Sequence, residues 1–365
     1  MTNVIEAEQR SFMTGNEVVA WAALAAGAEF MYGYPITPQN EIMHYWTRLA
    51  PKFKRGFLQT EDELSAGFAT LGGVMAGRKS FCATAGPGNV LMQEPISMAE
   101  MMRIPAVWFI QQRGGPSTAT VIYSQQETRL TCLGGNGEGN RLVYSTASHQ
   151  EVFDYAIKAF NNAWNYRFPT FVLGDGYQAK MREAVTLYDP AQRGIELHGT
   201  SRMLGRSSKQ LDGQQVRHYR NTFNIEEELY ETLMQHIADW DHMAEEVVEW
   251  AWEGDEEPDL LLVAHGVVSR AVYAAYEHLK SAGYNVAYFR PITLRPFPVA
   301  ALQRAAGRCR QLLVAESAYG QLLSLVRDSL YGKTCAPIEG LLRPGLGITE
   351  ELVVEWAQRL LARVG

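Results

Sequence analysis

Four short segments of the sequence combine hydroxyl, carboxylate, amide and guanidinium groups with glycine or proline. They are residues 34–39, 59–63, 84–89 and 111–118, and each follows a short apolar run that is typical of a β-strand. Ligands of open parallel sheets bind at the carboxyl ends of the strands, so these segments predict one shared binding site. Their side chains could hold a carboxylate and meet a ligand nitrogen.

Glu61 and Arg113 are the charged residues in these segments that best suit such chemistry. Glu61 closes a strand after Gln59 and Thr60, where a partly buried carboxylate can contact a ligand nitrogen. The alternative is that the acidic residues only compensate a helix dipole. Arg113 suits two-point binding of a substrate carboxylate, and its alternative is a surface ion pair. Either residue taken alone leaves both interpretations open.

Two glycine-rich segments require separate interpretations. In TAGPGN, residues 84–89, backbone N–H groups could approach a ligand closely, although a tight strand-to-helix turn would need the same glycines. GGNGEG, residues 134–139, does not match the GxGxxG fingerprint and follows no clear strand, so we interpret it as a flexible loop near a substrate.

Other familiar chemistries have no counterpart in the sequence. The eight histidines form no HxH or HExxH pattern and the four cysteines form no CxxC pair, so no metal or iron–sulfur site is predicted in this chain. The sequence also contains no Walker A loop and no GxSxG motif.

Composition narrows the class of protein further. The 33 Lys and Arg residues against 40 Asp and Glu residues give a net charge of −7, without a basic stripe, which argues against nucleic-acid binding. No stretch approaches the ~20 apolar residues that a membrane helix needs. The N-terminus lacks the apolar core of a signal peptide, and widely spaced cysteines are typical of free thiols in a reducing compartment. We expect a cytoplasmic protein without membrane insertion.

Alternating strands and helices would position the four segments. Up to residue 183 the pattern predicts a parallel sheet with helices on both faces, including a helix over 61–76. The pattern predicts that residues 184–257 form a bridging segment with a long helix over 226–252. Residues 258–365 are predicted to form a second α/β unit. We therefore expect an α/β fold with domains at 1–183 and 258–365.

The order of the motifs is similar to that of a known family. The motifs are YPITP at 34–38, QTEDE at 59–63, TAGPG at 84–88, RGGPST at 113–118, and GYNV at 283–286 leading to RPITLRPFP at 290–298. Nearly the whole chain resembles the alpha subunit of the 2-oxoacid:ferredoxin oxidoreductases. These are thiamine-diphosphate enzymes that include pyruvate and 2-oxoglutarate synthases. The motifs of this chain most resemble those of the 2-oxoglutarate branch.

The resemblance implies a fold, a reaction and partners. It implies a thiamine-diphosphate-binding fold, with a pyrimidine-type domain followed by a transketolase-C-like domain. The reaction would be reversible oxidative decarboxylation of a 2-oxo acid to CO₂ and an acyl-CoA, with coenzyme A as co-substrate. The diphosphate and Mg²⁺ site and a 4Fe–4S cluster would belong to a beta subunit. Gamma and ferredoxin-like subunits, and ferredoxin or another electron acceptor, complete the expected partners.

The resemblance also implies roles for individual residues. Glu61 would hydrogen-bond N1′ of the cofactor's aminopyrimidine, while Thr37 and Arg113 would hold the carboxylate and oxo group of the substrate. Further cofactor contacts are expected from Pro35, Ile36, Thr84, Gly86, Gly88 and Asn89, and further substrate contacts from Ser117, Thr118 and Tyr123. No metal ligand is expected in this chain.

One stretch departs from the 2-oxoglutarate branch. Residues 119–127 read ATVIYSQQE, and the apolar Val121, Ile122 and Tyr123 leave aromatic or branched 2-oxo acids open as substrates. Two further alternatives are a subunit of a non-oxidative thiamine-dependent decarboxylase or synthase, and a non-catalytic scaffold. The presence of both Glu61 and Arg113 argues against the scaffold.

Overall fold

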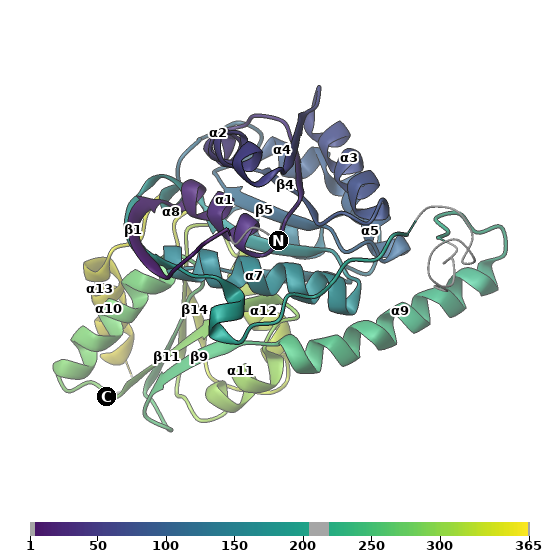
Figure 1. Ribbon diagram of the computed structural model, residues 1–365. Helices are drawn as coiled ribbons and strands as arrows, with labels where there is room; N and C mark the ends of the chain where they lie inside the picture. Colours follow the sequence, from purple (N-terminus) through teal and green to yellow (C-terminus); the bar gives the residue numbers. More distant parts are fainter. Residues whose placement is uncertain (1–3, 204–218, 364–365) are drawn as a thin grey trace.

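The structure, a computed structural model, describes residues 4–203 and 219–363 (Figure 1). Within these residues the first unit is built on a sheet of order β12-β6-β7-β5-β4-β2-β3. Every neighbouring pair is parallel except β12 with β6. The strands are β2 (Phe30–Gly33), β3 (Gly56–Gln59), β4 (Ser80–Thr84), β5 (Val107–Gln112), β6 (Leu142–Ser145), β7 (Thr170–Asp175) and β12 (Thr293–Arg295).

Helices cover both faces of this sheet, as the sequence predicts. One core joins α1, α2 and α7 to the sheet, and a second core joins α3 and α5 to its other face. Polar side chains fix several helix starts, because Thr14 and Ser148 accept hydrogen bonds from backbone N–H groups three residues on. The helices are α1 (Gly15–Ala25), α2 (Asn40–Leu49), η1 (Ala50–Phe53), α3 (Glu63–Met75), α4 (Pro87–Leu91), α5 (Gln93–Met102), α6 (Thr128–Leu133), α7 (His149–Tyr166) and α8 (Gly176–Lys180).

The predicted bridging segment is divided among several elements, and its residues 204–218 lie outside the described ranges. Its start lies in β8 (Arg182–Leu187), which pairs with β1 (Gln9–Thr14) and is followed by η2 (Pro190–Arg193). The long helix, α9 (Glu226–Val247), ends earlier than predicted, since β9 (Trp250–Gly254) pairs with β11 instead of continuing the helix. Alternating Trp250 and Trp252 favour a strand there.

The second unit is a separate sheet of order β14-β13-β10-β11-β9 in the described part of the chain. Its strands beside β9 are β10 (Leu260–Val263), β11 (Val286–Pro291), β13 (Leu312–Glu316) and β14 (Ile338–Leu342). Its helices are α10 (Val268–Ser281), α11 (Val299–Ala306), α12 (Gln321–Leu330) and α13 (Glu350–Leu361). Over the described residues, none of the helices combines the length and hydropathy that crossing a membrane requires.

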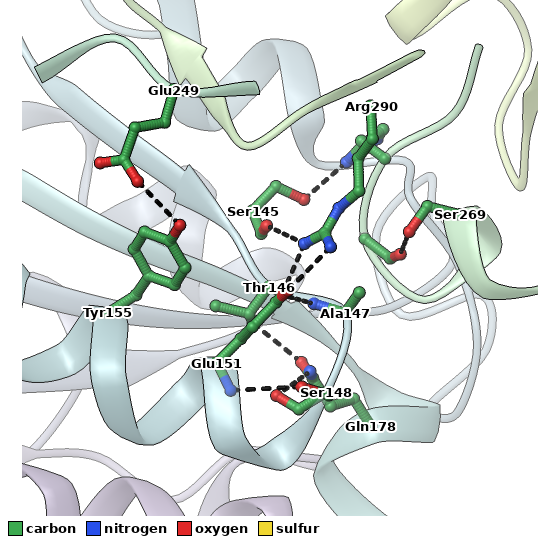
Figure 2. Close-up of polar contacts among 12 residues, drawn as sticks. Ser145, Thr146, Ala147, Ser148, Glu151, Tyr155, Gln178, Glu249, Ser269 and Arg290 are labelled. Atoms are coloured by element: carbon green, nitrogen blue, oxygen red, sulfur yellow. Dashed lines mark hydrogen bonds and ion pairs between the residues drawn. The ribbon is translucent and has the colours of Figure 1, made fainter. Parts of the chain in front are cut away.

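The two units share a continuous core and a polar junction. The core that packs α3 and α5 against the first sheet extends to β10, β11 and α12 of the second unit. At the junction, the Arg290 guanidinium donates to both carboxylate oxygens of Glu151, at 2.8 and 2.5 Å, and to the carbonyl of Ser145 at 3.2 Å (Figure 2). Buried charge is thus paired where the units meet.

Candidate active site

The loops that follow β2, β4 and β5 meet at the carboxyl ends of these strands in the first sheet. Arg113, which directly follows β5, donates from Nη1 to the carbonyl oxygen of Thr37 at 2.8 Å. The side chain of Arg113 also passes over Gly86, where an added Cβ would lie 2.5 Å from its Nε. Three of the four predicted segments therefore contact one another, as expected for the carboxyl ends of parallel strands.

The fourth segment contributes a different carboxylate from the predicted one. Asp62, not an earlier residue, is the N-cap of α3, because its Oδ1 accepts from the Ser65 N–H at 2.7 Å. The helix consequently begins at Glu63, two residues later than predicted. Glu63 is 5% exposed and points into the loop cluster, whereas the Glu61 side chain is exposed. Burial raises the pKa of Glu63, and the nearby Arg113 partly opposes this shift.

The TAGPG turn packs tightly against the buried carboxylate. Gly86 has φ +53°, a conformation that favours glycine. A Cβ at Gly88 would lie 2.1 Å from Thr84 Oγ1 and 2.8 Å from Glu63 Oε1. These contacts explain both glycines of the motif and bring Thr84 and Glu63 together.

Several buried polar atoms of this cluster have no hydrogen-bond partner within the described residues. They include Thr84 Oγ1 and Arg113 Nε, with Gln39 Oε1 and Gln111 Oε1 of the same segments. Buried polar groups are normally satisfied, so such atoms indicate a site that a polar ligand completes. Together with the buried carboxylate of Glu63 they fit the polar edge of an aminopyrimidine and the carboxylate of a small acid.

Glu127 is a site residue that the sequence reasoning missed. Its carboxylate is 5% exposed and accepts from the N–H groups of Gly86 at 2.7 Å and Arg113 at 2.9 Å, and from Asn89 Nδ2 at 3.0 Å. Asn89 Nδ2 also donates to Thr131 Oγ1, so the buried Asn89 amide links the TAGPG turn to both Glu127 and α6. No spacing signal marks Glu127, since only tertiary contacts bring it to the motifs.

The remaining predicted residues are distributed around this centre. Pro35 is exposed and Ile36 partly buried, next to the Thr37 carbonyl that Arg113 binds. Ser117 and Thr118 lie exposed on the loop after β5.

Tyr123, which was predicted to contact substrate, lines a different cavity. Its ring meets that of Tyr177 edge-on at 5.6 Å, and burial raises its pKa. The cavity has a volume of about 440 Å³ and is also lined by Met181, Arg270 and Ile348. Thr37 and Arg113 do not line this cavity.

Comparison with known families shows the family to which this chain belongs. A family model described as "Pyruvate flavodoxin/ferredoxin oxidoreductase, thiamine diphosphate-binding" matches residues 21–250, and one described as "Pyruvate:ferredoxin oxidoreductase core domain II" matches residues 258–346. The chain belongs to the 2-oxoacid:ferredoxin oxidoreductase family. The first match ends at the start of β9, and the second begins just before β10.

Curated relatives are alpha-type subunits of this family. The chain is 34% identical to 2-oxoglutarate synthase subunit KorA of Methanothermobacter marburgensis, over 85% of this chain and 88% of the relative. It is 32% identical to subunit KorA of Methanocaldococcus jannaschii, over 85% and 89%. It is 30% identical to ketoisovalerate oxidoreductase subunit VorB of Methanothermobacter thermautotrophicus, over 92% and 93%.

Solved structures agree with this membership. The 2-oxoglutarate:ferredoxin oxidoreductase of Magnetococcus marinus, solved with 2-oxoglutarate, coenzyme A and succinyl-CoA bound, matches with a TM-score of 0.86 at 25% identity. The match covers 96% of this chain and 65% of that one. A split-gene transketolase matches with a TM-score of 0.60 at 13% identity, which concerns the fold alone.

These findings confirm the main predictions from the sequence. The family, the 2-oxoglutarate synthase branch, the thiamine-diphosphate fold and the assignment as an enzyme subunit all agree with them.

Proposed function

We propose that this chain is the alpha subunit of a complex that oxidatively and reversibly decarboxylates a 2-oxo acid to CO₂ and an acyl-CoA. The observation that carries the proposal is the buried carboxylate of Glu63, packed against Thr84 and Gly88 and near the Arg113 guanidinium. Thiamine diphosphate, when bound, supplies the electron sink that decarboxylation of a 2-oxo acid requires.

Glu63, rather than the predicted Glu61, is our candidate for the carboxylate that binds N1′ of the aminopyrimidine. A group at this position must share a proton with a ring nitrogen, and efficient proton transfer needs a pKa near the working pH. Burial moves the pKa of Glu63 in that direction, while Glu61 lies exposed before the helix. The unpartnered Oγ1 of Thr84 lies beside Glu63 and supports the same edge of the ring.

Arg113 is our candidate for holding the substrate carboxylate. Its backbone N–H is held by Glu127 and its Nη1 by the Thr37 carbonyl, which fixes the guanidinium while Nε remains unsatisfied. A planar guanidinium with a free donor suits a carboxylate oxygen. Thr37 lies at the same place on the neighbouring loop and would contact the oxo group.

A partner subunit would complete the cofactor site. Exposed apolar side chains lie on α3 and α4 directly beyond Glu63, namely Leu64 at 37%, Phe68 at 37%, Val90 at 58% and Leu91 at 48% exposure. These two helices pack against each other, and such a patch beside a half-built site marks an interface. We assign it to a beta subunit carrying the diphosphate, Mg²⁺ and a 4Fe–4S cluster, which passes electrons to ferredoxin or another acceptor through gamma and ferredoxin-like subunits.

The names of the relatives suggest two classes of 2-oxo acid as the substrate of this chain. Relatives named 2-oxoglutarate synthase favour 2-oxoglutarate, and relatives named ketoisovalerate oxidoreductase favour a branched 2-oxo acid. Val121 is 38% exposed and Ile122 57% exposed on the loop after Arg113, and this loop carries no cationic side chain between residues 114 and 124. That composition favours an uncharged, branched or aromatic side chain.

The test is an assay of the complex purified with its natural partners. CoA-dependent reduction of a low-potential dye is measured with pyruvate, 2-oxoglutarate, a branched 2-oxo acid and an aromatic one. We expect reduction with at least one of them, and the ratio of kcat/KM values names the substrate class. Release of CO₂ without reduction of dye would instead identify a non-oxidative decarboxylase and overturn the proposal.

A further inference from the structure

The segment of residues 124–129 is bound on both sides. One side faces the candidate active site, and the other faces the second unit. We propose that Glu127, in the middle of this segment, is a positioning residue for the active-site loops, and that the second unit holds Glu127 in place. This inference rests on the proposed function and adds to it a role for the second unit.

On the active-site side, Glu127 ties together two loops that are distant in sequence. Its Oε1 accepts from the N–H groups of Gly86 and Arg113, at 2.7 and 2.9 Å, so the TAGPG turn and the start of the RGGPST loop share one oxygen. Its Oε2 accepts from Asn89 Nδ2 at 3.0 Å. Gly86 itself packs against the Arg113 side chain, so any shift of the carboxylate moves the guanidinium relative to the turn.

On the other side, residues flanking Glu127 are held by buried or partly buried groups of the second unit. Gln125 Nε2 donates to the His265 carbonyl at 2.8 Å, and the Ser317 N–H donates to Gln125 Oε1 at 3.0 Å. Gln321, at the start of α12, donates from Nε2 to the carbonyl of Gln126 at 2.6 Å and accepts the N–H of Arg129 at 2.9 Å.

The His265 ring belongs to the same contact. It is fully buried and lies 2.8 Å from Ser145 Oγ and 3.4 Å from Thr128 Oγ1. Burial lowers its pKa to about 3, so the imidazole stays neutral at working pH and holds the segment without adding charge. The contacts of this ring with Ser145 and Thr128 therefore do not change with protonation near neutral pH.

An amide cannot replace the Glu127 carboxylate. In Glu127→Gln, the amide oxygen can still accept from Gly86 and Arg113, but the NH₂ group then faces the Nδ2 donor of Asn89. The Asn89 side-chain amide cannot rotate to exchange its oxygen and nitrogen without cost, because its Nδ2 donates to Thr131 Oγ1 and its Oδ1 accepts from Gln93 Nε2. The new amide NH₂ and the Nδ2 of Asn89 would then face each other as two buried donors. The TAGPG turn and the RGGPST loop must shift to separate them.

The experiment compares variants in the natural complex, using the substrate found for the wild type. Glu127→Gln should lower kcat/KM on the order of tenfold to a hundredfold, with KM for the 2-oxo acid raised because Arg113 moves. Glu127→Asp keeps the acceptors and should recover part of the loss. Glu100→Gln is the matched control, since Glu100 is also buried and pairs with Arg141 away from the site. It should lower thermal stability and leave KM unchanged.

A second pair of variants tests the part played by the second unit. Gln321→Ala should raise KM severalfold, because it removes one hydrogen bond on each side of Glu127, to Gln126 and to Arg129. Gln303→Ala removes a comparable bond in the same unit, from Nε2 to the Ser329 carbonyl, and should leave KM unchanged.

The outcomes separate this inference from the proposed function. Activity of the wild-type complex tests the function, and the ratio of variant to wild type tests the inference. Wild-type KM and kcat in Glu127→Gln would overturn the role of Glu127. Equal losses in the Glu127 and Glu100 variants would also overturn it, since only stability would then be affected. If Glu127→Gln does not assemble, the same decisions rest on Glu127→Asp and Gln321→Ala.

Discussion

One N-cap determines which carboxylate enters the site. The sequence QTEDE offers three acidic residues, and a helix start at Glu61 or at Glu63 places different ones inward. The bond from the Ser65 N–H to Asp62 selects the later start, so Glu63 faces Thr84 and Gly88 while Glu61 faces outward. The motif predicted a site carboxylate two residues before our candidate Glu63, because three acidic residues so close together offer no pattern that selects one of them.

The two glutamates can be separated by paired substitutions. Glu63→Gln should lower kcat on the order of a hundredfold or more, because the amide cannot exchange a proton with the cofactor. Glu61→Gln should change kcat by no more than about twofold, because its side chain is exposed. Steady-state kinetics of both complexes give the comparison, and a larger loss in Glu61→Gln would restore the original assignment.

Asp175 makes stability depend on pH in a direction opposite to that of most carboxylates. It is fully buried, caps α8 through the Gln178 N–H, and burial raises its pKa from 3.8 to about 7. Between these values the folded state keeps a proton that the unfolded state releases, so this group's contribution to stability falls as pH rises from 4 to 7. Asp175→Asn retains the cap and cannot ionise.

The Asp175→Asn variant should therefore gain more in melting temperature at pH 8 than at pH 5. Thermal unfolding followed by circular dichroism at the two pH values measures the difference. Asp189→Asn, at the cap of η2, is the matched control. Equal gains at both pH values would contradict the expected proton uptake by Asp175.

Among the elements, those with their own periodicity were predicted well. The apolar runs predicted before residues 34, 84 and 111 form the strands β2, β4 and β5, since each run is a pattern complete in itself. The strand β9 was not predicted because its first residues extend the helical pattern of α9, and β12 was not predicted because it has only three residues. Both pair with a strand distant in sequence. Tertiary pairing decides such elements.

The apolar patch on α3 and α4 leads to a prediction about assembly. Phe68→Glu should weaken association with the partner subunit on the order of tenfold, since Phe68 and Leu64 share one exposed face of α3. Tyr331→Glu, at an 89% exposed position of the second unit, should have no effect. Size-exclusion chromatography of the co-expressed subunits over a dilution series measures both. Undiminished association in Phe68→Glu would move the interface elsewhere.

For the whole molecule, the junction between the units is a polar contact as well as a shared core. Arg290 is 8% exposed and depends on Glu151, which lies on α7 of the first unit and also accepts from the Ala147 N–H (Figure 2). The sequence predicted the α/β fold but not this contact, because the partners are 139 residues apart. Long-range pairs leave no local pattern.

Removing Glu151 tests how strongly the units depend on each other. Glu151→Ala should lower the free energy of unfolding by about 2–4 kcal/mol, because it leaves the Arg290 charge unpaired in a largely buried place. Glu355→Ala removes an exposed pair with Arg359 within one helix and should cost less than about 1 kcal/mol. Denaturant unfolding gives both values, and equal losses would show that the junction pair acts like a surface pair.

The strand β12 has a consequence for any attempt to divide the chain. It comes from the second unit but pairs with β6, which would otherwise be the last strand of the first sheet. A fragment that ends before Thr293 would leave the N–H and C=O groups along that side of β6 without partners. Such open sheet margins bind one another, so the fragment should aggregate or exchange strands between copies. The second unit therefore also protects the first unit from self-association, because β12 covers the exposed side of β6.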